Sequence, residues 1–210
     1  MRAEFSLTAV GGAALAAIAL SAPPAGHALA LRNSIPANSD KIGTASPRLT
    51  LTHIEAEAAS REGLLPPHTR SVLNPHKRLS YGEYMWNDQG VPPGPVRVRV
   101  DLRRQLISVF RAGEEIGTAV VLYGSSEKGT PRGEFPILAK LRTHRSNIYD
   151  APMPYTLRLT ADGVAIHASD VRWGYATHGC IGVPTGFAQR LFDQAKLGDV
   201  VDVVESPNLT

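Results

Sequence analysis

The most informative scarcity in this sequence is that of cysteine. The 210-residue chain has a single cysteine, Cys180. A scaffold held by internal disulfides needs cysteines in pairs, and a zinc site of four thiolates needs four, so the sequence excludes both. Aromatic residues make up only 6% of the chain, and the mean hydropathy is −0.10. A polytopic membrane protein is therefore excluded as well.

The sequence also lacks a large excess of either positive or negative charge. Lys and Arg number 22 and Asp and Glu number 19, which gives a net charge of +3 and a pI of about 9.2. This mildly basic balance suits an anionic polymer of the cell envelope, and no dense basic run indicates nucleic acid. With 19 glycines and 16 prolines, the composition favours one turn-rich domain, either α/β or mostly β.

The first 30 residues are typical of an export signal. Arg2 provides a weak positive start, Val10 to Ala22 is small and apolar, and Ala28-Leu29-Ala30 has the small-x-small form that precedes cleavage. The apolar run is shorter than the roughly 20 residues of a membrane-spanning helix, which is the alternative. No cysteine follows the run, so lipoprotein processing is excluded. We therefore expect a mature chain in the periplasm or cell envelope without a stable membrane span.

Residues 31–95 are interpreted as a lead-in arm. Thr52-His53-Ile54-Glu55 has the form of a capping box, and Gly63 follows shortly after Arg61, which predicts a short helix. Six prolines between residues 64 and 95 leave no sustained periodicity. We expect Tyr81, Tyr84 and Trp86 to pack against the rest of the protein.

A regular alternation begins at Val96 and predicts a β-rich domain over residues 96–206. Short strands are predicted at 96–100, 105–111, 116–123, 135–141, 156–159, 163–168 and 199–204, and a helix at 185–196. Asp162-Gly163 marks a hairpin turn between two of these strands. The pattern predicts a mostly-β sandwich or barrel with one or two short helices. The sequence has no GxGxxG, P-loop or HExxH motif.

The segment from Thr177 to Pro184 is the candidate site of chemistry. Cys180 lies in a glycine-flanked turn, and a second histidine, His167, ends a predicted strand. A neighbouring imidazole can accept a thiol proton, and backbone N–H groups of a tight turn can hold an oxyanion. Two alternatives remain open from the residues alone: a buried structural cysteine, or a metal site made from His167, His178, Cys180 and Asp170.

Thr177-His178-Gly179-Cys180-Ile181, preceded by Ile166-His167, resembles the signature of the L,D-transpeptidase (YkuD-type) family. Further segments resemble the family in the same order along the chain, from about Val96 to Val204. They are Val98–Leu102 with Gln105–Ile107, the loop Gly129–Phe135, Met153-Pro154-Tyr155 and Leu197–Val201.

The resemblance implies a cysteine acyltransferase that acts on peptidoglycan stem peptides without a metal or organic cofactor. Cys180 would attack the carbonyl of the third stem residue and release D-alanine, with His167 as the general base. The turn of His178, Gly179 and Cys180 would stabilise the oxyanion. Substrate contacts would come from Met153, Tyr155, Ser169 and Thr177. The thioester would pass to an amine, giving a 3→3 cross-link or attachment of an envelope protein.

The sequence departs from the family pattern at three points. Gly182 stands where the family usually has an arginine that organises the site or contacts a carboxylate, and Arg172 and Arg190 are the candidates to substitute for it. The spacer between His167 and Thr177 is shorter than in many relatives. Ala168 replaces the usual glycine or serine. An L,D-carboxypeptidase that trims stem peptides, a catalytically silent peptidoglycan-binding relative, and another peptidase or amidase are the alternatives.

Overall fold

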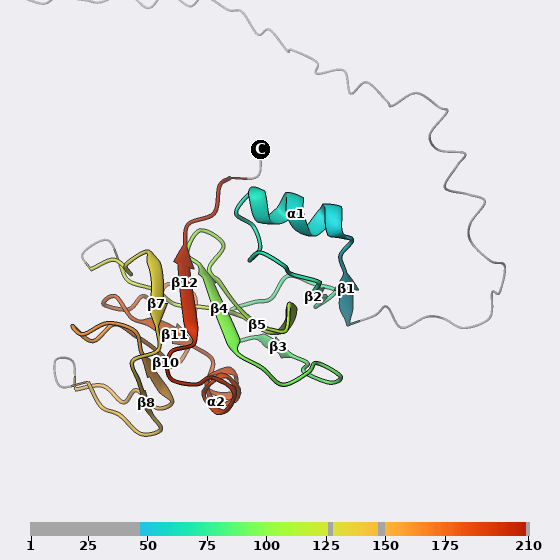
Figure 1. Ribbon diagram of the computed structural model, residues 1–210. Coiled ribbons are helices and arrows are strands. Elements are labelled where there is room, and N and C mark those ends of the chain that lie inside the picture. The colour runs from blue at the N-terminus through green and yellow to red at the C-terminus, as the bar shows by residue number, and fades with distance from the viewer. Residues whose placement is uncertain (1–46, 126–127, 147–149, 209–210) are drawn as a thin grey trace, which may run out of the picture. The chain divides into compact units, whose positions relative to one another are not determined.

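Two open β-sheets and two helices make up the part of the protein that the computed structural model describes, residues 47–125, 128–146 and 150–208 (Figure 1). The predicted signal peptide at 1–30 and the start of the predicted arm lie outside the described residues. The mostly-β prediction with two short helices is confirmed, with open sheets in place of a closed barrel. Among the described residues, no helix has the length and apolar character needed to cross a membrane.

The larger sheet has eight strands in the order β1-β2-β6-β5-β4-β12-β7, with β3 also paired to β6. Their bounds are β1 Arg48–Thr50, β2 Ser71–Leu73, β3 Tyr84–Trp86, β4 Val96–Asp101, β5 Leu106–Arg111, β6 Glu114–Val120, β7 Gly133–Pro136 and β12 Val200–Val204. The alternation that predicted β4 is real, since Val96, Val98 and Val100 are all buried. The last strand, β12, runs parallel to β4 and places the C-terminal segment in the middle of the sheet.

The smaller sheet has four strands in the order β11-β10-β9-β8. Their bounds are β8 Ala139–Leu141, β9 Thr156–Arg158, β10 Ala165–Ala168 and β11 Ile181–Val183. The single strand predicted at 135–141 is wrong, because β7 pairs with β12 in the larger sheet and β8 pairs with β9 in the smaller one. The chain changes sheets between them, at Ile137 and Leu138. The predicted hairpin is confirmed as β9 and β10, which pair antiparallel across Asp162-Gly163.

Both predicted helices are present. α1, His53–Arg61, begins with the complete capping box: the Thr52 side chain accepts from the Glu55 backbone, and the Glu55 side chain accepts from the Thr52 backbone. α2, Thr185–Gln194, directly follows Pro184 and buries one face, consisting of Phe187, Ala188, Leu191 and Phe192. This face joins the main core with the valines and isoleucines of both sheets.

Residues 47–95 contribute three strands, β1, β2 and β3, to the larger sheet. β3 runs antiparallel to β6, with Trp86 opposite Gly117. A Cβ atom on Gly117 would lie 2.3 Å from the Trp86 ring, so glycine is what allows this close approach. The rings of Trp86 and Phe187 meet edge to face with centroids 5.5 Å apart. Residues from the predicted arm therefore complete the core beside α2.

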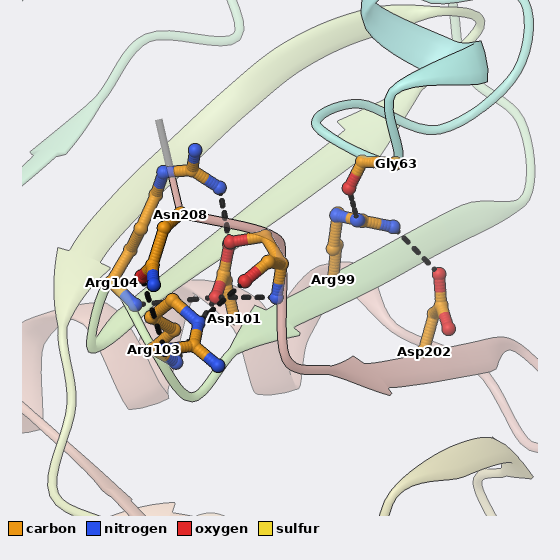
Figure 2. Close-up of polar contacts among 8 residues, drawn as sticks. Gly63, Arg99, Asp101, Arg103, Arg104, Asp202 and Asn208 are labelled. Atoms are coloured by element: carbon orange, nitrogen blue, oxygen red, sulfur yellow. Dashed lines mark hydrogen bonds and ion pairs between the residues drawn. The ribbon is translucent and has the colours of Figure 1, made fainter. Parts of the chain in front are cut away.

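A buried arginine connects three separate parts of the chain. Figure 2 shows Arg99 of β4 donating to the carbonyl oxygen of Gly63, just after α1, and to the carboxylate of Asp202 on β12, the latter at 3.0 Å. Arg99 and Asp202 are both largely buried, so each charge needs this partner. A neighbouring group of polar contacts ties the β4–β5 turn to the C-terminal segment through Asp101, Arg103, Arg104, Ser206 and Asn208.

Replacing Trp86 with alanine should destabilise the fold, because it opens a cavity over Gly117 and removes the ring contact with Phe187. We expect a loss of about 2–4 kcal/mol and a Tm lower by roughly 5–15 °C. Thermal unfolding followed by circular dichroism measures the change. Trp173→Ala is the matched control, since that side chain is 80% exposed and should leave Tm nearly unchanged. Equal Tm values for the two variants would show that β3 does not stabilise the domain.

Candidate active site

Strand register brings the two candidate catalytic residues to one face of the smaller sheet. β10 and β11 pair in parallel, with His167 opposite Gly182. Successive side chains of a strand point to opposite faces. Ile166 on β10 and Ile181 on β11 are buried in the core. His167, and Cys180 directly before Ile181, therefore belong to the other face.

The turn that carries Cys180 is fixed at its base. The Thr177 backbone donates to Tyr123 at 3.0 Å and accepts from Ser125 at 3.1 Å. The Thr177 hydroxyl donates to the Cys180 carbonyl oxygen at 2.5 Å and closes the turn. Gly179 has a φ of +103°, a conformation that side-chain-bearing residues rarely adopt. The sequence Thr-x-Gly-Cys thus specifies a tight turn that holds the sulfur in place.

A cavity of about 350 Å³ opens at this turn. Five of the predicted site residues line it: Met153, His167, Thr177, His178 and Cys180. The other described lining residues are Lys128, His144, Ser146, Ala151, Asp162, Gly163 and Val164. The Cys180 thiol lies 3.8 Å from the Gly163 carbonyl oxygen, within reach of a weak S–H···O hydrogen bond.

One wall of the cavity comes from the stretch between β8 and β9. The part that follows β8 and the part that precedes β9 pair through backbone hydrogen bonds. The N–H of Tyr155 donates to the carbonyl oxygen of Arg142 at 2.9 Å, and that of Met153 donates to His144 at 2.8 Å. The N–H of Ser146 donates to the carbonyl oxygen of Ala151 at 2.9 Å. His144 and Ser146 are two residues apart, and so are Ala151 and Met153. All four side chains therefore lie on the side of this paired stretch that faces the cavity. This stretch has no hydrophobic periodicity, so His144 could not be predicted as a site residue from the sequence.

The remaining predicted site residues do not line the cavity. Tyr155 packs edge to face on Phe192, with ring centroids 5.8 Å apart, and Arg142 stacks over its ring. Ser169 lies against Gly182, and Gly179 shapes the turn through its backbone. The roles assigned to these residues stay predictions.

A hydrogen bond determines which ring nitrogen of His167 carries the proton. Its Nδ1 atom lies 2.8 Å from the carbonyl oxygen of Ala168. A carbonyl oxygen can only accept, so Nδ1 carries the proton and Nε2 keeps a lone pair when the ring is neutral. Burial lowers the pKa of His167, the Ala168 hydrogen bond partly opposes this, and the nearby His144 lowers it further. The ring is thus a neutral base near pH 7.

The thiol of Cys180 is also kept neutral. Burial raises the pKa of Cys180, and the negative charge of Asp162 adds to this effect. A hydrogen bond from the Ala165 backbone and the positive charge of Lys128 act in the opposite direction without cancelling the rise. The resting site therefore holds a thiol and an imidazole rather than a thiolate–imidazolium pair.

The four residues considered as metal ligands do not come together in one site. Asp170 pairs with Arg172, with an N–O distance of 2.8 Å, and does not line the cavity. Within residues 47–125, 128–146 and 150–208, no three His, Cys, Asp or Glu side chains are grouped so that they could hold a metal ion.

Comparison with known families agrees with this geometry. The model of the L,D-transpeptidase catalytic domain, YkuD, matches residues 95–203, more than half of the chain. The chain belongs to the L,D-transpeptidase family. The resemblance inferred from the motifs is thereby confirmed, together with the fold that it implied.

The chain also matches solved structures of L,D-transpeptidases. The enzyme from Stackebrandtia nassauensis is 25% identical over 57% of this chain and 60% of its own, with a TM-score of 0.50. The enzyme from Mycobacterium smegmatis is 24% identical over 52% and 58%, with a TM-score of 0.49. This chain thus spans about three fifths of the length of these structures. No curated protein resembles it closely enough to count as a match.

Glycine at position 182 has a steric explanation within this member of the family. A Cβ atom there would lie 2.9 Å from Cβ and 3.2 Å from Oγ of Ser169, closer than packed carbons normally approach. Ser169 therefore fills the space that an arginine side chain would have to enter. Of the two arginines suggested as replacements, Arg172 pairs with Asp170 and Arg190 is exposed on α2, and neither lines the cavity.

Because the raised pKa reduces the thiolate fraction at any given pH, alkylation of Cys180 by iodoacetamide should be slow near pH 7. The rate should keep rising above pH 8.5, the ordinary pKa of a cysteine. Intact mass follows the reaction, and the single cysteine makes the readout specific. The control is the same chain unfolded in guanidinium chloride, whose midpoint should return to the ordinary value. A plateau at neutral pH would mean that the thiolate is already formed.

Proposed function

We propose that the protein is an exported L,D-transpeptidase that acts on peptidoglycan stem peptides through a thioester on Cys180. The observation that carries this proposal is that His167 and Cys180 share one face of a sheet and line one cavity in a member of this family. Its substrates lie outside the cytoplasm, which is consistent with the signal peptide predicted at residues 1–30. The role is then in cell wall biogenesis and cell shape, in the periplasm or envelope.

The first half of the proposed reaction forms the thioester. Nε2 of His167 accepts the thiol proton while the sulfur of Cys180 bonds to the carbonyl carbon of the third stem residue. Proton transfer accompanies attack because both groups start neutral. The carbonyl oxygen becomes an oxyanion, which backbone N–H groups of the turn from His178 to Cys180 stabilise. The C–N bond then breaks, His167 returns the proton to the departing amine, and D-alanine leaves.

The second half transfers the acyl group. His167 accepts a proton from the incoming amine as the amine nitrogen attacks the thioester carbon. The C–S bond then breaks, and His167 passes the proton to the departing sulfur, which regenerates the Cys180 thiol and the neutral ring. An amine of a second stem gives a 3→3 cross-link, an amine of an envelope protein gives an attachment, and water gives carboxypeptidase activity. In this proposal Met153 and Thr177, which line the cavity, contact the donor peptide.

Incubation with purified tetrapeptide muropeptides, followed by mass spectrometry of the products, tests the reaction and its outcome. Cys180→Ala should abolish every product, and His167→Ala should slow the reaction by about 10²–10⁴-fold because it removes the general base. His53→Ala, on the exposed face of α1, is the matched histidine control and should react like the wild type. Product formation by Cys180→Ala at the wild-type rate would refute the thioester mechanism.

A carbapenem should acylate Cys180. Its strained lactam carbonyl can take the place of the scissile carbonyl, and ring opening releases no fragment. The intact mass should therefore increase by the whole mass of the drug, once per chain, with no increase in Cys180→Ala. An unchanged wild-type mass after prolonged incubation would count against an accessible nucleophilic thiol.

A further inference from the structure

Lys128 lies beside the catalytic turn in a position that the loop fixes. The Lys128 backbone N–H donates to the Ser125 carbonyl oxygen at 3.2 Å, and the Thr130 hydroxyl accepts from the Gly124 N–H at 2.9 Å. Cγ and Cε of Lys128 lie 3.7 and 3.8 Å from the point where a Cβ of residue 179 would be. Because Gly179 has no side chain, the lysine stem can run alongside the turn that carries Cys180.

The charges around the cavity single out Lys128. Among the described residues that line the cavity, only Lys128 carries an ammonium group and only Asp162 carries a carboxylate. The other titratable groups in this lining are three histidines and the Cys180 thiol. No ion pair joins Lys128 to another residue of the described ranges. Its positive charge also acts on the sulfur, as the direction of its effect on Cys180 shows. A cation in this position is available to an anionic group that enters the cavity.

We propose that Lys128 binds a carboxylate of the acyl-donor peptide and replaces the cation that is missing at Gly182. The inference rests on the proposed function, in which the donor ends in D-alanine with a free α-carboxylate. The diamino acid at the third position can carry a second carboxylate on its side chain. An ammonium–carboxylate hydrogen bond is stronger than one between neutral groups. Lys128 would then orient the donor with its scissile carbonyl over Cys180.

The test measures binding, which does not depend on turnover. Cys180→Ala and the double variant Cys180→Ala/Lys128→Met are titrated by calorimetry with three synthetic tetrapeptide stems. The first has both carboxylates free, the second is amidated at the terminal D-alanine, and the third is amidated at the side chain of the third residue. Cys180→Ala/Lys196→Met is the matched control, since Lys196 is exposed after α2 and outside the cavity.

We expect Lys128→Met to weaken binding of the free acid roughly tenfold to a hundredfold, the usual effect of losing a hydrogen bond between charged groups. Amidation of the carboxylate that Lys128 binds should weaken binding to the Lys128-containing protein by a similar factor. The same amidation should hardly change the affinity of the Lys128→Met protein. Whichever amidated stem shows this pattern identifies the carboxylate, and either result supports the proposal.

Turnover with otherwise wild-type protein separates this role from an effect on the thiol. If Lys128 acts only by stabilising the thiolate, Lys128→Met lowers kcat by one factor for all three stems and leaves binding unchanged, which overturns the proposal. Equal affinity of both titrated proteins for every stem, including no binding by either, also overturns it. Lys128-dependent binding without wild-type turnover would instead refute only the proposed transpeptidase function.

Discussion

The parallel pairing of β10 with β11 is the interaction on which the candidate site depends. It sends Ile166 and Ile181 into the core and leaves His167 and Cys180 on the opposite face. Burial of the isoleucines fixes the register, because a slip of β10 by one residue would expose Ile166 and turn His167 toward the core. The same apolar contacts that stabilise the smaller sheet therefore set the geometry of the chemistry.

Burial has an electrostatic cost at this site. The cavity that holds the sulfur and the ring also disfavours their charged forms, so the pKa of Cys180 is raised and that of His167 is lowered. A preformed ion pair would react with any electrophile that reached it. A neutral thiol and imidazole react only when a substrate carbonyl is in place, because the sulfur bonds to the carbonyl carbon as the ring accepts the thiol proton. The Ala168 carbonyl makes this possible, because it holds the Nδ1 proton and directs the lone pair to Nε2.

Much of the fold could be predicted because its longer strands alternate. β4, β5 and β12 were found from their valines, and α1 from its capping box. The three-residue strands β1, β2, β3 and β11 were missed, since three residues cannot establish a period. At the site, the Gly-Cys turn and a preceding histidine singled out Cys180 and His167 as candidates, but only the resemblance to the family assigned them catalytic roles, which stay predictions. Lys128 and His144 lie in irregular loops, where position depends on tertiary contacts rather than on a local pattern.

Residues 47–95 also bear on the site, although none of them lines the cavity. Trp86 packs on the bare backbone of Gly117 and meets the ring of Phe187. Phe187 is in the first turn of α2, which begins two residues after β11 ends. The ring is fully buried, so its position restrains the helix and, through the short connection, the strand that follows Cys180. Close packing at the N-terminal segment thus supports the turn that carries the thiol.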